Sequence, residues 1–600
     1  MAEAPFRPLG RLGLGDQPAR RRIPPGELDA GCFTDQTASS VAAYEIFRLQ
    51  RVAVGQLDVD TGVVLREARH FMSAIDRHPN SNSLLLFKCP LTKSFISIID
   101  SKKQPVPARN NKTHPSHLCK IASSIKKGEW QMPDTERYEN LVIGSGEAGK
   151  YISWTMAKAG HQVAMVERKN LGGSCPNVAC LPSKNLIYSA RVASLAKRGA
   201  EFGLEMDSLS INMVGVQRRK RLMVEEQHQV HIDLGVANGV ELIMGNARFI
   251  APRTVEISLN DGGARTILAD RVFLALGSRA TIPNVPGLAA AQPMTHIEAL
   301  NLDRLPEHLI VLGGGYVGLE LSQAMRRFGS QVTIMEAGSQ LARQEDPDVG
   351  TALLELFRDE GIDVALETHV SRVEGRSGQK IRIHAKDQHG ERILEGTDIL
   401  VATGRMANAD GIELELTGVE LDRHGYIKVN ERLETTAANI WAMGDSAGSP
   451  QFTHVAFDDF RVVYGNLNGD NRTTKNRLVP FCLFTDPELA RVGRNESEAR
   501  RDGIAYRVAK MRAADVLRNV TVSEPRGFLK ILIGANSDEI LGFTAFCFEA
   551  SEPMAAVQTA MIGRMPYTAL RDAIFTHPTM AEGLIGLLAS IPAKSTQRSA

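Results

Sequence analysis

The sequence has little of what marks several large classes of protein. Its 600 residues contain only seven cysteines, too few for a scaffold held together by disulfides. Lysine and arginine (70) almost balance aspartate and glutamate (69), which argues against a protein that works by neutralising nucleic-acid phosphates. The longest apolar stretches, such as Gly583 to Pro592, are far shorter than the roughly 20 residues of a membrane-spanning helix.

A secretory signal is also missing, because the arginines near the N-terminus are not followed by an apolar core. These absences predict a cytoplasmic protein without nucleic-acid or membrane partners. A content of 43% hydrophobic and 23% charged residues is typical of globular proteins. The length predicts about two to four domains.

Residues 1–136 differ from the rest of the chain. Pro18 to Pro25 is rich in proline and arginine, Ser101 to His117 is polar, and no helical or strand period holds for long. Leu84 to Phe87 and Phe95 to Ile99 are candidates for short strands. We predict a poorly ordered extension, with a small unrecognised domain as the alternative. A further hypothesis is that Met132 is the natural start.

Two strand–helix–strand patterns follow. The first consists of Asn140 to Gly144, Glu147 to Gly160 and Gln162 to Glu167, and the second of Leu309 to Leu312, Tyr316 to Gly329 and Gln331 to Glu336. Such a unit implies parallel strands joined by a right-handed crossover. The sequence therefore predicts two nucleotide-type domains, with a separate module from about Pro480 onward.

Each unit contains a glycine fingerprint between its first strand and its helix. The glycines are Gly144, Gly146 and Gly149 in the first unit, and Gly313, Gly315 and Gly318 in the second. Glycines permit a tight turn and let the backbone approach a pyrophosphate at the helix N-terminus. The fingerprints predict two dinucleotide sites.

An acidic residue ends the second strand of each unit. Glu167 and Glu336 have the spacing at which a carboxylate binds ribose hydroxyls. A carboxylate repels a 2′-phosphate, so Glu336 favours NADH over NADPH. Three arginines near this position in the sequence could instead favour the 2′-phosphate of NADPH: Arg326, Arg327 and Arg343. The alternative is that these arginines belong to a solvated helix face and loop.

Between the two units, Cys175 and Cys180 flank four residues at the start of a predicted helix. A helix N-terminus stabilises a thiolate and makes a cysteine nucleophilic. The alternatives are two buried structural thiols or half of a metal site. Because no second pair has metal-like spacing, no metal site is predicted. In a cytosolic chain the pair is most simply interpreted as a redox-active dithiol.

From Tyr138 to Pro592, the order of these motifs resembles that of the class I FAD-dependent pyridine nucleotide-disulfide oxidoreductases. The family includes dihydrolipoamide dehydrogenase, glutathione reductase and mercuric reductase. The resemblance implies an α/β fold with two Rossmann-like nucleotide-binding domains, for FAD and NAD(P), and an α+β C-terminal dimerisation domain. The implied division is 137–283 and 406–478 for the FAD domain, 284–405 for the NAD(P) domain and 479–600 for the dimerisation domain.

The resemblance also implies roles for individual residues. Cys175 matches the interchange thiol that attacks the substrate, and Cys180 matches the thiol that faces the flavin. Lys184 and Glu320 match an ion pair near the flavin. Tyr316 matches an aromatic gate at the place where nicotinamide stacks on the flavin.

Further cofactor-binding positions come from the same resemblance. Gly173 belongs to the cysteine motif, and Gly404 to a turn between the FAD and NAD domains. Gly444 and Asp445 match a second FAD motif, in which Asp445 binds the ribityl chain. Thr453 is expected to begin a helix directed at the flavin, whose positive end stabilises the reduced flavin.

Near the C-terminus, His577 and Glu582 match an acid–base pair of the family. There the histidine reaches across a dimer into the partner's disulfide site, and the glutamate orients it and raises its basicity. The resemblance therefore implies a symmetric homodimer in which each active site contains residues of two chains.

The chain also departs from the family. It lacks the C-terminal cysteine pair of mercuric reductases, since its last cysteine is Cys547. No Cys-x-x-Cys motif is formed by Cys32, Cys89 and Cys119. Pro176 and Ala179 replace residues that are usual in the well-known branches, which leaves the thiol substrate open. Cys482 and Cys547 lie in apolar sequence and are predicted to be buried packing residues.

The resulting prediction is an FAD-dependent oxidoreductase acting on sulfur groups. Electrons pass from NAD(P)H, with NADH preferred, through FAD and the Cys175–Cys180 disulfide to a disulfide or related acceptor. The reverse direction would oxidise a dithiol such as dihydrolipoamide. The alternatives are a flavoenzyme that reduces mercuric ion or quinone, and a non-catalytic flavoprotein that senses redox state.

Overall fold

The computed structural model describes residues 135–594 and two short antiparallel strands, β1 (Phe87–Lys88) and β2 (Phe95–Ile96). These strands fall at or next to the two predicted near the N-terminus. The other predictions for residues 1–136 concern residues outside the described part of the chain, and so do Cys32, Cys89 and Cys119. The part that contains residues 135–594 is a separate compact unit, and the rest of this description concerns it.

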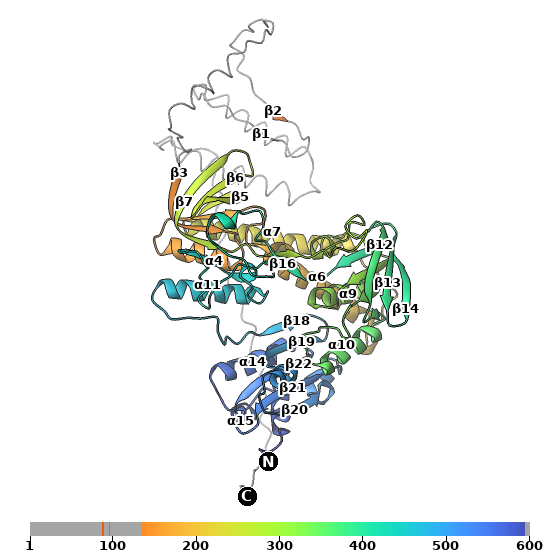
Figure 1. Ribbon diagram of the computed structural model, residues 1–600. Coiled ribbons are helices and arrows are strands. Elements are labelled where there is room, and N and C mark those ends of the chain that lie inside the picture. Colours follow the sequence, from red (N-terminus) through yellow and green to blue (C-terminus); the bar gives the residue numbers. More distant parts are fainter. Residues whose placement is uncertain (1–86, 89–94, 97–134, 595–600) are drawn as a thin grey trace, which may run out of the picture. The chain divides into compact units, whose positions relative to one another are not determined.

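A six-stranded sheet of order β17-β7-β3-β4-β5-β6 forms the first layer of this unit (Figure 1). Its strands are β3 (Thr135–Ile143), β4 (Val163–Glu167), β5 (Glu241–Ala251), β6 (Thr254–Leu259), β7 (Ala264–Leu274) and β17 (Ile440–Ala442). All are parallel neighbours except that β6 runs antiparallel to β5 and β7. Every residue of β4 is buried, as expected for a parallel strand covered on both faces.

Helices that pack on this sheet or follow its strands include those that carry the two cysteines and Thr453. They are α4 (Glu147–Lys158), α5 (Ser174–Val178), α6 (Cys180–Lys197), α7 (Met213–Ala237) and α11 (Thr453–Leu467). Figure 1 shows α4 and α11 side by side although about 300 residues separate them, and the two helices contact each other. The predicted helix from Glu147 ends two residues early, because Gly160 turns the chain with a φ of +93°.

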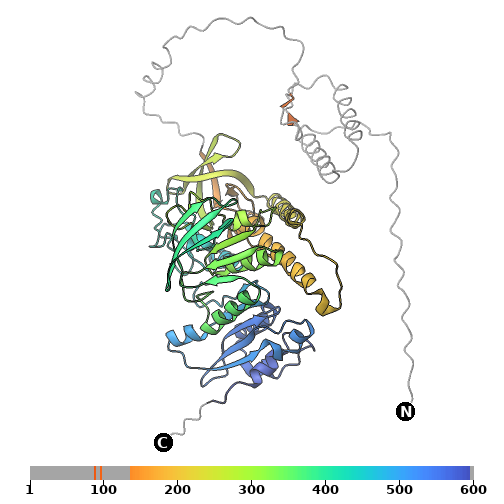
Figure 2. The same ribbon diagram turned by 90° about the vertical axis from the view of Figure 1, so that its right-hand side faces the viewer.

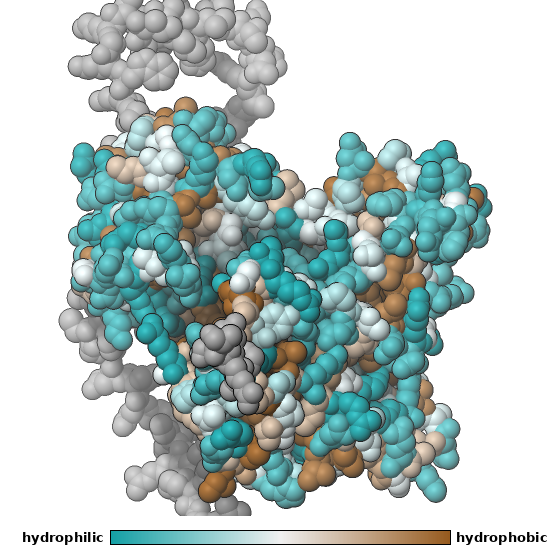
Figure 3. All heavy atoms as spheres, turned by 60° about the horizontal axis from the view of Figure 1, so that its bottom comes forward, coloured by the Kyte–Doolittle hydropathy of each residue, from teal (hydrophilic) through white to brown (hydrophobic). Residues whose placement is uncertain are grey.

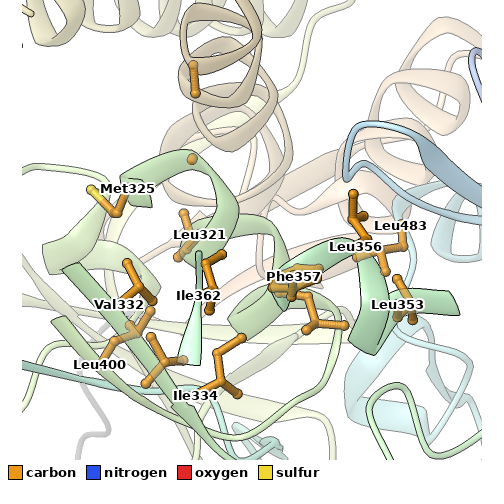
Figure 4. Close-up of a cluster of buried hydrophobic side chains, with 14 of the residues drawn as sticks. Leu321, Met325, Val332, Ile334, Leu353, Leu356, Phe357, Ile362, Leu400 and Leu483 are labelled. Carbon is orange, nitrogen blue, oxygen red and sulfur yellow. The ribbon is translucent and has the colours of Figure 1, made fainter. Parts of the chain in front are cut away.

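A second, fully parallel sheet has the order β11-β10-β9-β15. It contains β9 (His308–Leu312), β10 (Gln331–Met335), β11 (Asp363–Ala365) and β15 (Asp398–Val401), with the helices α9 (Tyr316–Phe328) and α10 (Pro347–Asp359). An antiparallel sheet of β12 (His369–Gly375), β13 (Ile381–Asp387) and β14 (Gly390–Gly396) packs beside it. Figure 4 shows the apolar core under α9 and α10, which Leu483 of a later strand joins.

The last sheet is antiparallel, in the order β18-β19-β22-β21-β20. Its strands are β18 (Phe481–Leu483), β19 (Glu488–Gly493), β20 (Tyr506–Arg512), β21 (Phe528–Gly534) and β22 (Ile540–Cys547), and its helices are α12 (Glu496–Arg501), α13 (Leu517–Thr521), α14 (Ser551–Ile562), α15 (Tyr567–Arg571) and α16 (Gly583–Ala589). In Figures 1 and 2 this sheet, drawn in blue, lies at the opposite end of the unit from the six-stranded sheet.

Short elements connect these layers: β8 (Ser278–Ala280), α8 (His296–Ala299) and β16 (Arg405–Ala407). Two nucleotide-type sheets, the first mainly and the second fully parallel, are followed by an antiparallel α+β part, which corresponds to the predicted fold class. Within the described residues, no helix is both long enough and apolar enough to cross a membrane.

A buried lysine ties the last sheet to the second sheet. The side chain of Lys530, on β21, is 1% exposed. Its ammonium nitrogen lies 2.8 Å from a carboxylate oxygen of Asp346, 2.9 Å from Asp348 and 3.1 Å from Glu496. A buried cation is stable only with such partners, so this cluster fixes the loop before α10 against the last sheet.

We expect Lys530→Met to lower the free energy of unfolding by about 3 kcal/mol or more, because it leaves buried carboxylates without their cation. The matched control is Lys510→Met, since the Lys510 ammonium lies 2.7 Å from Asp348 but its side chain is 43% exposed. The control should cost less than about 1 kcal/mol. Urea unfolding followed by circular dichroism measures both values, and equally small losses would contradict the expectation.

Candidate active site

The structure brings the two cysteines of the motif together. Cys175 lies in the short helix α5, and Cys180 is the first residue of α6. Both are half-buried free thiols, and they are hydrogen-bonded to each other. The Cys180 sulfur also lies 3.1 Å from the hydroxyl oxygen of Thr453, the first residue of α11. A close dithiol at two helix N-termini can undergo thiol–disulfide exchange.

The two thiols differ in acidity. The pKa of Cys180 is lowered to about 6, chiefly by the hydrogen bond from Cys175. Burial of the thiol raises this pKa, but the Thr453 hydroxyl and the Lys184 charge lower it again. The pKa of Cys175 is raised, because this thiol donates to Cys180 and is partly buried. Cys180 therefore carries the thiolate and Cys175 the shared proton. Within the described residues, no group of three or more potential ligands could hold a metal ion.

An ion pair lies one helical turn further along α6. The Lys184 ammonium is 2.8 and 3.0 Å from the two carboxylate oxygens of Glu320, on α9. The Phe484 backbone N–H donates to Glu320 at 2.9 Å, and Lys184 lies 4.7 Å from the centre of the Phe484 ring. Three segments far apart in sequence thus meet beside the dithiol.

The first glycine fingerprint fits a diphosphate. At Gly144, where φ is +98°, a Cβ would lie 2.3 Å from the Ala275 carbonyl, and at Gly149 it would lie 2.0 Å from the Gly144 carbonyl. At Gly146 the nearest atom would be 4.0 Å away, and no side chain caps the N-terminus of α4. The first N–H groups of α4 therefore face open space, as an anion site requires.

A carboxylate stands beside this turn. Glu167, at the end of β4, accepts hydrogen bonds from the Ser145 N–H at 3.0 Å and the Lys169 N–H at 2.8 Å. Gly173 packs against the same turn, because a Cβ on it would lie 2.5 Å from the Gly146 Cα. The residues present therefore fit the adenosine diphosphate part of FAD.

The second fingerprint repeats this geometry. A Cβ would lie 2.5 Å from the Ala402 carbonyl at Gly313 and 2.2 Å from the Gly313 carbonyl at Gly318. A Cβ on Gly315, which precedes α9, would meet nothing within 4 Å. Glu336 accepts the N–H groups of the backbone around it, from Gly314 at 2.7 Å and from Gly338 at 2.6 Å.

Of the three arginines near this fingerprint in sequence, two are engaged elsewhere. Arg327 pairs with Glu360 and Asp486, both at 2.7 Å, and Arg326 donates to the Glu360 carbonyl. Arg343 is exposed and packs over Gly338, next to the Glu336 carboxylate. Only Arg343 among the three therefore lies at the carboxylate end of this site.

The second FAD motif is held by polar contacts. Asp445 accepts a hydrogen bond from Ser278, which also accepts one from Arg405 at 2.8 Å. Next to it, the Gly444 N–H donates to Asp459, a buried carboxylate of α11 that pairs with Arg477. Gly404, with a φ of +132°, lies in the adjoining turn, where its carbonyl accepts the Thr281 N–H.

Several of these partners were missed by sequence reasoning. They are Ser278, Asp459, Arg477 and, beside Tyr316, Glu345 and Arg491. No local signal singles out Asp459, because Asp458 and Arg461 lie beside it in the same helix. For the others no local motif exists.

His577 and Glu582 meet on the last part of the chain. The Nδ1 atom of His577 lies 2.9 and 3.0 Å from the two Glu582 carboxylate oxygens, and the His577 side chain is 63% exposed. With Nδ1 held by the carboxylate, Nε2 is available to exchange a proton with a group outside this chain.

The remaining two described cysteines behave as packing residues in different degrees. Cys547 is fully buried in the core of the last sheet, and burial raises the pKa of its thiol. Cys482 is only half-buried by its neighbours, and its sulfur lies 3.9 Å from the Glu488 carboxylate. The apolar residues around Cys482 in the sequence gave no indication that its thiol lies near the Glu488 carboxylate.

Comparison with known proteins bears on the same residues. The family model for pyridine nucleotide-disulphide oxidoreductases matches residues 138–459, and the model for their dimerisation domain matches residues 479–586. The structure of the HOCl-induced flavoprotein disulfide reductase RclA from Escherichia coli is 33% identical, with a TM-score of 0.69 over 76% of this chain and 100% of that one. A Cu(II) complex of that reductase has also been solved.

Two mercuric reductases are similarly related. The one from Acidithiobacillus ferrooxidans is 33% identical over 75% of this chain and 82% of its own length. The one from Shigella flexneri is 34% identical over 74% and 79%. With both family models matched across most of the described chain, the protein belongs to the class I pyridine nucleotide-disulfide oxidoreductases and is an FAD-dependent enzyme acting on sulfur groups.

Proposed function

We propose that the dithiol of Cys175 and Cys180 is the redox centre of this enzyme, and that it reduces a disulfide acceptor. FAD, when bound, carries electrons between a nicotinamide nucleotide and this dithiol. Cys175 attacks one acceptor sulfur, the other leaves as a thiol after taking a proton, and Cys180 then displaces the second thiol as the Cys175–Cys180 disulfide forms. The observation that carries the proposal is the pair of free thiols, hydrogen-bonded to each other, with the Cys180 sulfur 3.1 Å from the Thr453 hydroxyl.

The acceptor class follows from the chemistry of the chain and its relatives. The RclA neighbour is described as a disulfide reductase, and other relatives are mercuric reductases. Mercuric-ion reduction is not favoured for this chain, because no cysteine follows Cys547 that could deliver metal to the inner thiols. A disulfide of a small molecule or protein is therefore the proposed acceptor.

A homodimer completes the site in this proposal. The histidine that serves Cys175 is His577 of a second copy, which fits the exposure of its ring. Further along the helix that Cys180 begins, α6 exposes an apolar stripe of Tyr188, Val192 and Leu195, with the i, i+4, i+7 spacing of a packed helix face. Figure 3 shows apolar groups on the C-terminal end of the unit, where Ile562, Met565 and Ile574 are exposed. Exposed apolar surface of this kind marks interfaces.

The remaining proposals concern organisation and compartment. The sheets and the matched family models support a division into 137–283 and 406–478 for FAD, 284–405 for NAD(P) and 479–600 for dimerisation. We place the enzyme in the cytoplasm, where thiols are kept reduced. NADH is the proposed nucleotide, because Glu336 faces the position of the ribose and two of the three nearby arginines are engaged elsewhere.

Cys180→Ser tests the redox centre. The variant should lose disulfide turnover by about 10³-fold or more, because a serine cannot form the disulfide that receives the electrons. It should still bind FAD, and NADH should still bleach the flavin absorbance in an anaerobic cuvette. Undiminished turnover of a panel of disulfides would refute the proposed relay.

Subunit mixing tests the two-chain site. Cys175→Ser and His577→Ala should each be nearly inactive as homodimers. In a heterodimer of the two, one site combines Cys175 of one chain with His577 of the other and is intact. Random association should therefore restore about a quarter of the unmodified activity. A mixture as inactive as its parents, with heterodimers shown by mass spectrometry, would contradict the arrangement.

Glu336→Gln tests the nucleotide preference. The amide keeps the size of the side chain but no longer repels a 2′-phosphate, so we expect kcat/KM for NADH to fall about ten-fold and that for NADPH to rise. Adding Arg343→Ala should cancel the NADPH gain, because Arg343 is the one of the three arginines considered that lies at this end of the site. An unchanged ratio of the two values would show that Glu336 does not set the preference.

A further inference from the structure

The hydroxyl of Tyr316 is tied to a buried carboxylate. Tyr316 is the first residue of α9, and its O–H donates to a carboxylate oxygen of Glu345 at 3.1 Å. Glu345 lies in the loop between β10 and α10, and its side chain is 0% exposed. A carboxylate buried this deeply needs partners for its charge, so the tyrosine hydroxyl contributes to keeping it there.

The second partner of Glu345 comes from the last sheet. Arg491, on β19, places its Nε atom 3.0 Å from the other carboxylate oxygen, and donates to Glu498 at 2.8 Å. The Arg491 guanidinium also lies 4.5 Å from the centre of the Phe481 ring, which in turn lies 6.1 Å from the Tyr316 ring. Tyr316, Glu345, Arg491 and Phe481 thus form one cluster, which we call the tyrosine cluster.

The loop that carries Glu345 is fixed on both sides of it. The Gln344 carbonyl accepts a hydrogen bond from the Asn495 side chain at 3.0 Å. Asp346 accepts the N–H groups of Glu496 and Ser497 at 3.0 and 2.9 Å, and pairs with the buried ammonium of Lys530. Glu345 therefore cannot follow the tyrosine if the ring moves, and movement of the ring breaks the hydrogen bond.

We propose that Glu345 is a positioning residue that latches Tyr316 over the nicotinamide site, so that a nucleotide must break the Tyr316–Glu345 hydrogen bond before its nicotinamide can enter. This inference rests on the proposed function and on the family resemblance, in which Tyr316 matches the aromatic gate at the place where nicotinamide stacks. Burial and the neighbouring carboxylate raise the pKa of Tyr316, so its hydroxyl stays protonated and remains the donor. The latch would disfavour nicotinamide entry without touching the binding of the adenine end.

A purely structural tie makes a different prediction. If the hydrogen bond only stabilised the fold, its loss would lower the melting temperature and weaken the binding of every nucleotide alike. A latch separates the two ends of the nucleotide, because only the nicotinamide competes with the tyrosine ring. ADP-ribose, which lacks the nicotinamide, is therefore the matched ligand for NAD⁺.

The experiment is calorimetric titration of the oxidised, FAD-loaded enzyme with NAD⁺ and with ADP-ribose. Tyr316→Phe keeps the ring and removes the donor, and should tighten NAD⁺ binding about ten-fold, the loss of a hydrogen bond to a charged group. ADP-ribose binding should change by less than about two-fold. If the enzyme binds NADP⁺ instead, NADP⁺ and 2′-phospho-ADP-ribose replace this pair.

Two further variants locate the effect. Glu345→Gln removes the charge of the acceptor and should give a smaller gain for NAD⁺, and the double variant should bind no more tightly than Tyr316→Phe alone, since both changes remove one interaction. Tyr506→Phe is the control, because the Tyr506 hydroxyl donates to Glu496 at 2.9 Å in the last sheet. It should change neither affinity.

The outcomes are distinct. Unchanged NAD⁺ affinity in Tyr316→Phe, an equal change in ADP-ribose affinity, or additive effects in the double variant would each overturn the latch while leaving the proposed function intact. An unmodified enzyme that binds none of these nucleotides would remove the proposed function, and the latch with it.

Discussion

The hydrogen bond between Cys175 and Cys180 is the interaction on which the rest of the site depends. One proton shared by two thiols separates their acidities, and leaves the negative charge on Cys180. The charge is then supported by the hydroxyl of Thr453, from the distant helix α11, and by the ammonium of Lys184, one turn further along α6. A thiolate held in this way is poised for electron exchange, while the neighbouring thiol keeps the proton it must lose before it can attack.

The sequence predicted those parts of the site whose residues lie close together along the chain. The two glycine fingerprints and the acids that follow them lie within single strand–helix–strand units, where spacing fixes their position, and the helix starting at Cys180 begins at its own cysteine motif. The resemblance to a known family supplied the pairing of Lys184 with Glu320 and of His577 with Glu582, which the geometry reproduces within one chain. The roles of these residues stay predictions.

What sequence reasoning missed depends on the tertiary structure. Ser278 matters because β8 lies beside the turn of Asp445, and Glu345 because a loop brings it to Tyr316. Neither residue stands in a motif, and each would pass for an ordinary surface residue. The arginines show the converse, since Arg327 lies near the second fingerprint in sequence but is occupied by Glu360 and Asp486. Proximity along the chain cannot decide such cases.

Buried ion pairs fix the loop and the helices around Tyr316 against the last part of the chain. Lys530 with Asp346, Arg327 with Asp486 and Arg491 with Glu345 all join the second sheet or its helices to the last part of the chain. Pairs of this kind cost much of their attraction in desolvation and contribute more to a unique arrangement than to net stability. They hold Glu345, the acceptor of the Tyr316 hydrogen bond, in a fixed place, as the proposed latch requires. The same pairs fix the second sheet relative to the part of the chain that carries His577, the residue that the proposal assigns to the site of a second copy.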